Sequence, residues 1–212
     1  MESIIRLTKE FLWNTLNAST NIDDIEKKYR YEHSLRVSHI GKQISKVEGA
    51  DTLIVEIGCL LHDVGKFQTE VNRDHGRVSA MVAKVFLETL NLSNKQIDDI
   101  CYAIAVHVDG EAGYLYEETL ESKIVTDSDN IDRFGAYRIY QSLDWDNIKQ
   151  MKIEEAYEKI SNRIKRLEKL VEEYDLETTE GTRLFKDNIK FQIQFYNRYL
   201  LELENTLIEL ND

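Results

Sequence analysis

The placement of histidine and aspartate residues in this chain indicates a metal site. The chain has only five histidines, and one of them, His62, is followed directly by Asp63 at the end of a strongly apolar stretch, Thr52–Leu61. A carboxylate buried beside apolar residues is unfavourable unless it is paired or bound to metal. Neighbouring side chains on a helix point roughly 100° apart, so His62 and Asp63 reach one ion most easily where the helix ends. Gly65 follows the pair and can supply the backbone freedom that such an end needs. We therefore interpret His62 and Asp63 as metal ligands rather than as a solvent-facing helix end.

Four further candidate ligands lie in separate predicted helices or helix ends. They are His33, His75, His107 and Asp129. Imidazole together with carboxylate suits divalent manganese, iron, cobalt, nickel or zinc, with Mg²⁺ as a further option. A helical bundle builds a metal site from side chains that different helices project into its core. Spacing alone does not show that the four converge, and Asp127 competes with Asp129 for the last position.

The elements that must position these residues are predicted to be helices. Apolar residues recur at steps of three and four, the helical period, and the absence of proline favours helices with short connections. Gly49 is expected to end one helix in the left-handed conformation, and Ser93 to cap the start of another. Helices are predicted over about 3–16, 22–47, 52–61, 76–90, 93–107 and 120–143, followed by two long charged helices over 147–174 and 183–210.

No segment alternates convincingly enough to predict a strand, so the expected fold is all-α. We predict a metal-binding helical domain over residues 1–145 and a C-terminal helical extension of the same domain over residues 146–212. Packing of the two long C-terminal helices on the preceding helices is favoured over a coiled-coil contact with a partner. The expected oligomeric state is a monomer or a homodimer.

The composition of the chain limits the molecules that it is expected to bind. The chain carries 27 basic and 39 acidic residues, a formal net charge of −12, which argues against binding to nucleic acid phosphates. An anionic substrate would need local cations, and bound metal could supply them. The two cysteines, Cys59 and Cys101, lack a CxxC pattern and are expected to be buried, reduced thiols. There is no signal-peptide pattern and no run of roughly 20 apolar residues, so we predict a soluble cytoplasmic protein with no membrane partner.

The sequence around the candidate ligands resembles the HD-domain superfamily of metal-dependent phosphohydrolases. The resemblance covers about residues 25–145, and its motifs are His33–Val37, Leu60–Lys66, His75–Ala80, Ile104–His107 and Leu120–Ala136. It implies a helical bundle that holds two metal ions, or one, because some family members bind a single ion. His33, His62, Asp63 and Asp129 would hold the first ion, while Asp63 would bridge to a second ion held by His75 and His107.

The last motif departs from the family pattern in two places. Many relatives have alanine where this chain has Ser128, and often arginine where it has Asn130. These differences are expected to alter substrate contacts more than metal binding. Asp129 is preferred over Asp127 as the ligand because Ile131 and Asp132 align behind it.

The resemblance implies hydrolysis of a phosphate ester or anhydride by metal-activated water, in a nucleotide or a small phosphorylated metabolite. Asp63 and Lys66 are the predicted catalytic residues, and Lys66, Arg36 and Arg133 the predicted substrate contacts. Each cation has a structural alternative, because lysine can stabilise a helix end and arginines often form ion pairs. Asp132 is expected to orient a ligand histidine. The fifth histidine, His39, points to a different helix face from His33 and is interpreted as structural.

Two other functions fit the same ligands. One branch of the fold is a di-iron oxygenase acting on a cyclic polyol, which iron content and oxygen uptake would reveal. The other alternative is a non-catalytic module that senses a nucleotide or a metal. The phosphohydrolase is favoured because the flanking motifs resemble the hydrolase branches.

Overall fold

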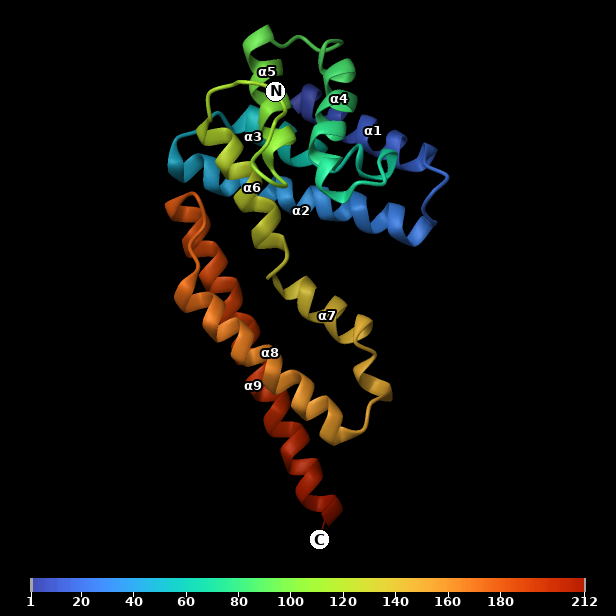
Figure 1. Ribbon diagram of the computed structural model, residues 1–212, viewed down its shortest axis with the longest axis vertical. Coiled ribbons are helices and arrows are strands. Elements are labelled where there is room, and N and C mark those ends of the chain that lie inside the picture. Colours follow the sequence, from blue (N-terminus) through green and yellow to red (C-terminus); the bar gives the residue numbers. More distant parts are fainter. Residues whose placement is uncertain (1, 212) are drawn as a thin grey trace. The chain divides into compact units, whose positions relative to one another are not determined.

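The structure, a computed structural model, describes residues 2–211, and the side chains of residues 3–206. Within this part of the chain all regular structure is helical, which confirms the predicted all-α fold (Figure 1). The helices are α1 (Glu2–Ala18), α2 (Asp24–Glu48), α3 (Thr52–Leu61), α4 (His75–Leu87), α5 (Asn94–Val106), α6 (Leu120–Asp132), α7 (Ala136–Trp145), α8 (Ile153–Glu173) and α9 (Thr179–Asn211). Three short 3-10 helices, η1 (Lys66–Gln68), η2 (Asn72–Asp74) and η3 (Ile148–Gln150), lie in the connections.

The chain packs as two compact units. The first comprises Met1–Asp132 with Glu177–Gly181, and the second comprises Arg133–Leu176 with Thr182–Asp212. All six candidate ligands belong to the first unit. The predicted packing of the C-terminal helices on the metal-binding domain stays a prediction.

Helix α3 forms the centre of the first unit. Every residue from Ile54 to Leu61 is buried, as its apolar sequence predicts, and α3 packs against α1, α2, α5 and α6. The Asp51 side chain caps its first turn by accepting from the Leu53 backbone N–H at 2.9 Å. The buried Glu56 carboxylate is paired with Lys42 Nζ at 2.9 Å. Packing on so many neighbours fixes where α3 ends, and His62 and Asp63 follow at that point.

Both predicted helix caps are confirmed. Gly49 ends α2 with φ of 79° and donates its N–H to the Ser45 carbonyl. Ser93 begins α5 through a reciprocal capping box with Gln96. Cys59 and Cys101 are buried free thiols, as predicted. Among the described residues, none of the helices combines the length and the apolar character needed to cross a membrane.

The single helix predicted over residues 120–143 is wrong. Helix α6 ends at Asp132, and α7 begins after Gly135, whose backbone is extended with ψ of 173°. The Gln192 amide donates to the carbonyls of Phe134 and Gly135, at 2.7 and 3.2 Å. These two carbonyls have no partner within a helix, and Gln192, on a helix distant in the sequence, supplies one. The apolar periodicity of residues 120–143 cannot indicate a contact with a residue so far along the chain.

Helices α8 and α9 form an antiparallel pair within the second unit (Figure 1). The rings of Tyr174 and Phe185 lie 6.0 Å apart, and Arg163 contacts Tyr196 further along the same pair. The buried side chains lie on one face of each helix. They are Ala156, Ile160, Ile164 and Leu167 on α8, and Phe185, Ile189, Gln192 and Tyr196 on α9.

Candidate metal centre

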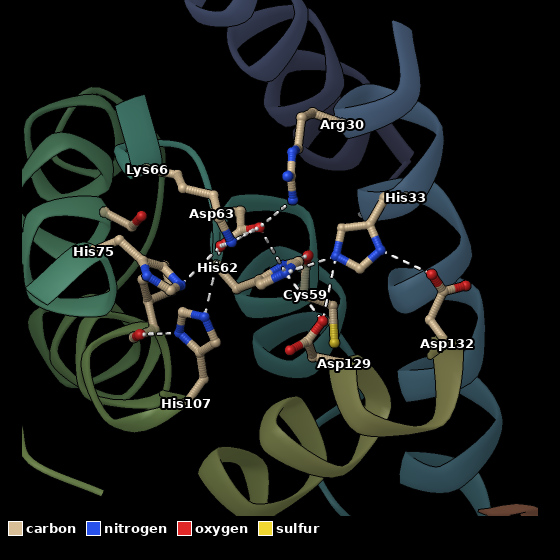
Figure 2. Close-up of polar contacts among 12 residues, drawn as sticks. Arg30, His33, Cys59, His62, Asp63, Lys66, His75, His107, Asp129 and Asp132 are labelled. Carbon is tan, nitrogen blue, oxygen red and sulfur yellow. Dashed lines mark hydrogen bonds and ion pairs between the residues drawn. The ribbon is translucent and has the colours of Figure 1, made fainter. Parts of the chain in front are cut away.

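The six predicted ligands converge at one place in the first unit (Figure 2). Each of them is at most 6% exposed. His33 lies within α2, His62 at the end of α3, Asp63 in the following turn, His75 at the start of α4, His107 at the end of α5 and Asp129 in α6. Five helices therefore contribute to one buried polar cluster.

The turn after α3 places Asp63 against α4. Gly65 has φ of −100°, which other residues also adopt, so the expectation that it supplies unusual backbone freedom is wrong. Its role is close approach. A Cβ on Gly65 would lie 2.7 Å from the Ser79 backbone nitrogen, and the Gly65 N–H donates to Ser79 Oγ at 2.9 Å.

A second close approach brings His75 to His107. A Cβ on Gly76 would lie 2.6 Å from the Ala105 carbonyl oxygen, so α4 can begin against the end of α5 only with glycine there. The rings of His75 and His107 are consequently 5.1 Å apart between centroids.

Each of the four histidine rings has its Nδ1 atom against an oxygen acceptor. His33 faces Asp132 Oδ2 at 2.8 Å, His62 the Cys59 carbonyl at 2.7 Å, His107 the Ile104 carbonyl at 2.7 Å and His75 the Asn72 carbonyl. Carbonyls and carboxylates only accept, so these partners assign the proton of each neutral ring to Nδ1 and leave a lone pair on Nε2. All four Nε2 atoms then point into the cluster.

The inward atoms form two groups. We call the first group, His33, His62 and Asp129, the His33 half. In it the Nε2 atoms of His33 and His62 lie 3.3 and 3.7 Å from Asp129 Oδ1. We call the second group, Asp63, His75 and His107, the His75 half. In it the Nε2 atoms of His75 and His107 lie 3.1 and 3.7 Å from Asp63 Oδ1. The other oxygen of Asp63, Oδ2, is 3.8 Å from His62 Nε2, so Asp63 presents one oxygen to each half.

This arrangement fits divalent metal. Lone pairs and carboxylate oxygens repel one another in a buried site unless a cation lies between them. The ligand atoms of His33, His62 and Asp129 all lie within 4.8 Å of one another, and so do those of His62, Asp63 and His107. The donor set of imidazole and carboxylate suits first-row transition ions. The residues could therefore hold one or two ions.

The electrostatic surroundings favour the ligand forms of His62 and Asp63, whereas the two aspartates beside His33 favour its protonated form until a metal ion takes the place of the proton. Burial lowers the pKa of His62 to about 4, so its imidazole is neutral near pH 7. For His33 burial opposes protonation, but Asp129 and Asp132 outweigh it and raise the pKa. For Asp63 burial opposes ionisation, yet His62, His107, His75 and Lys66 hold its pKa well below the usual value. Asp63 is consequently a carboxylate.

Two cations lie beside Asp63. Lys66 Nζ is 3.1 and 2.9 Å from its two oxygens, and an Arg30 nitrogen is 3.4 Å from Oδ2. The sequence interpretation missed Arg30. Its signal was its position three residues before His33, which places both side chains on the same face of α2. The Arg30 guanidinium also lies 5.6 Å from the centre of the Phe67 ring, which helps to fix it.

Arg36, another predicted substrate contact, is paired with a carboxylate behind the ligands. Arg36 Nε donates to Asp132 Oδ1 at 2.8 Å, so it supports the carboxylate that holds His33. Arg133 belongs to the second unit. Substrate contact by Lys66, Arg36 or Arg133 stays a prediction.

The structure distinguishes the two aspartates of α6. Asp129 faces His33 and His62, whereas Asp127 accepts from the Glu177 and Thr178 backbone N–H groups at 3.0 and 2.8 Å. Residues two apart on a helix point roughly 200° apart, so the two carboxylates cannot share one site. The fifth histidine, His39, is exposed and contacts Gln43 on α2.

Comparisons with known proteins agree with this geometry. Residues 30–133 match the family model of the HD domain. A predicted HD-superfamily hydrolase from an uncultured Thermotogales bacterium is 20% identical, with a TM-score of 0.67 over 93% of this chain and 91% of that one. An HD-superfamily hydrolase from Bacillus thuringiensis is 17% identical, with a TM-score of 0.69 over 96% and 98%. YpgQ from Bacillus subtilis, in complex with ADP, is 18% identical, with a TM-score of 0.63 over 93% and 94%.

No match was found among curated proteins. At these identities the solved structures show a shared fold. The matched family model, with which the convergence of the motif residues agrees, identifies residues 30–133 as an HD domain, so the chain contains a domain of the HD superfamily.

Proposed function

We propose that the protein is a metal-dependent phosphohydrolase that cleaves a phosphate ester or anhydride, most simply in a nucleotide. One observation carries the proposal: four imidazoles with their Nδ1 atoms held by acceptors direct Nε2 lone pairs at two buried carboxylates. The names of two similar structures, both HD-superfamily hydrolases, support hydrolysis. The ADP bound to the related Bacillus subtilis protein supports a nucleotide ligand.

The proposed ligands follow the two halves of the cluster. The His33 half, with one oxygen of Asp63, would hold one ion, and the His75 half a second. Asp63 is the proposed bridge because its Oδ1 faces His75 and His107 while its Oδ2 faces His62. Divalent ions held there would lower the pKa of coordinated water and stabilise negative charge on phosphoryl oxygens.

Lys66 and Arg30 are the proposed contacts for the substrate phosphate. Both are paired with Asp63 in the protein alone. Once Asp63 serves as a metal ligand, its charge is shared with the metal and these two cations can donate to an anionic substrate. Their position explains how a chain with net charge −12 can attract a phosphate.

Water is the proposed nucleophile because the cysteines are unsuitable. Burial raises the pKa of the Cys59 thiol to about 12 and that of Cys101 to about 11. A thiol attacks as the thiolate, and neither residue forms one near neutral pH.

Arg36 acts in this scheme as a positioning residue, because it holds Asp132, which in turn holds His33.

The test compares two histidine variants, His62→Ala and the matched control His39→Ala. Metal content is measured by elemental analysis, and phosphate release is followed on a nucleotide panel with manganese, iron, cobalt, nickel, zinc or magnesium. Wild type and His39→Ala should bind metal and release phosphate, and a chelator should abolish release. His62→Ala should do neither.

Three results would contradict the proposal. Phosphate release by the protein in the presence of a chelator would show that the reaction needs no metal. Bound iron with oxygen uptake and no phosphate release would indicate the di-iron oxygenase. Metal or nucleotide binding without turnover would indicate a sensing module.

A further inference from the structure

The second unit contains a cleft whose walls are rich in arginine. Arg133, Arg138, Arg163 and Arg166 line it, and its volume is about 460 Å³. These are four of the eleven arginines in a chain with net charge −12. Pockets for small ligands span roughly 300–1,000 Å³, so the cleft is large enough for a small organic molecule.

Arg138 has a donor that the protein does not use. Its Nε atom is the one buried side-chain nitrogen or oxygen, among the residues that the structure describes, without a hydrogen-bond partner. The guanidinium lies 5.0 Å from the centre of the Trp145 ring, which holds it in place. A buried unsatisfied donor is unfavourable, and an acceptor on a bound molecule would give it a partner.

Arg163, one of the lining arginines, shares its acidic partner with a lysine. Arg163 donates to the Asp146 carboxylate at 2.5 Å and to the Tyr196 hydroxyl at 3.0 Å. Asp146 also pairs with Lys159 at 3.0 Å, so one carboxylate serves two cations. Arg166 lies three residues after Arg163 on α8 and is exposed. Planar guanidinium forks bind phosphate through paired hydrogen bonds.

The other lining residues are three apolar ones and two polar ones, Ser142 and Gln192. Phe134, Leu167 and Leu170 belong to the cleft, and the Gln192 amide fixes its shape by donating to the Phe134 and Gly135 carbonyls. A free phosphate would use the arginines but not this apolar surface. The chemistry therefore fits a molecule with a phosphate chain at one end and a ring at the other.

We infer that the cleft binds a nucleoside polyphosphate, with its phosphates on the arginines and its base against the apolar surface. This site consists only of residues from the second unit and uses no residue of the metal cluster. Binding there requires no metal, which separates it experimentally from the proposed hydrolysis.

The experiment is calorimetric titration of the full chain with ATP in the presence of EDTA. We expect ATP to bind and Arg166→Gln to weaken binding about tenfold or more, because a charge-assisted contact to phosphate is lost. The matched control is Lys165→Gln, which removes the same charge from the neighbouring exposed position outside the lining. Lys165→Gln should bind ATP as wild type does, and Arg138→Gln should weaken binding as Arg166→Gln does.

Two further titrations test the ligand class and the location. Inorganic tripolyphosphate should bind at least about tenfold more weakly than ATP, because it lacks a ring to cover the apolar surface. Asp63→Ala should keep full ATP affinity in EDTA. The inference is overturned by absence of ATP binding in EDTA, by equal weakening in Arg166→Gln and Lys165→Gln, by equal affinity for tripolyphosphate, or by loss of binding in Asp63→Ala.

Discussion

The His33 half and the His75 half of the cluster hold their ligands in different ways. In the His33 half, the His33 ring rests on a carboxylate, Asp132, which Arg36 holds in turn. In the His75 half, both rings rest on neutral backbone carbonyls. A carboxylate behind a histidine makes the ring a stronger ligand than a carbonyl does. We therefore expect the His33 half to bind its ion more tightly.

The two carboxylates of the cluster also differ in their surroundings. Lys66 contacts both oxygens of Asp63, and Arg30 contacts Oδ2, the oxygen that faces His62. Asp63 itself lies in a turn, whereas Asp129 lies within α6. We therefore expect Asp129 to serve only as a ligand of the His33 half, and Asp63 to combine its ligand role with a position beside two cations that can receive a phosphate.

The largest effect is expected from Asp63→Ala, which removes an oxygen from both halves at once. Metal content should fall to near zero, and phosphate release should fall by about a thousandfold or more, which corresponds to about 4 kcal/mol of transition-state stabilisation. Elemental analysis and phosphate release measure the two quantities. Turnover close to wild type would show that Asp63 is not a ligand.

The matched pair His33→Ala and His75→Ala separates the halves. His75→Ala should lower metal content from about two ions to about one, and the remaining ion should resist dialysis because the His33 half is intact. His33→Ala should weaken the tighter ion and leave the protein with less metal than His75→Ala. If His75→Ala retained less metal than His33→Ala, the His75 half would be the one that binds its ion more tightly.

Asp132→Asn tests the source of the difference between the halves. The amide can still contact His33 but lacks the charge, so metal affinity should fall by roughly 10–100-fold, the usual range for groups behind a ligand. Competition with a fluorescent chelator measures the affinity. The control is Asp109→Asn, which removes a carboxylate paired with Arg77 and should leave affinity unchanged. An equal loss of metal affinity in both variants would mean that the affinity depends on the net charge of the protein and not on the contact between Asp132 and His33.

Much of this site follows from residue types and their neighbours. The apolar residues of α3 predict a buried helix, and the polar pair at its end must then be satisfied inside the protein. Motif similarity adds the order of the other ligands. Sequence also identified Asp132, whose contact with His33 is present at 2.8 Å.

What the sequence could not reveal depends on contacts between distant segments. The end of α6 depends on Gln192, about 60 positions along the chain, and the role of Gly65 depends on Ser79. Arg30 carries only a weak signal, its spacing from His33, because arginines are common on helices. Motif alignment preferred Asp129 over Asp127, and the packed helix adds the direction of each side chain.

Asp127→Asn and Asp129→Asn extend the comparison to two neighbouring carboxylates of one helix. Asp127 accepts from two backbone N–H groups and the Thr178 hydroxyl. An amide in its place must turn one NH₂ toward a donor, which should lower the free energy of unfolding by roughly 1–3 kcal/mol and leave metal content unchanged. Asp129→Asn should lose metal from the His33 half. Urea unfolding and elemental analysis give both quantities, and metal loss in Asp127→Asn would contradict the assignment.

The smallest effect concerns the two thiols, which report on how closed the His33 half is. Cys59 lies behind that half, and its carbonyl accepts from His62, whereas the Cys101 thiol contacts the Ala80 carbonyl. Burial raises their pKa values to about 12 and about 11, above roughly 8.5 for an exposed cysteine. Thiolate forms only as pH approaches those values, so neither thiol should react with Ellman's reagent between pH 7 and about pH 10. Removing metal should leave Cys101 unreactive, and a rise in Cys59 reactivity on chelation would show that the His33 half needs its ion to stay closed.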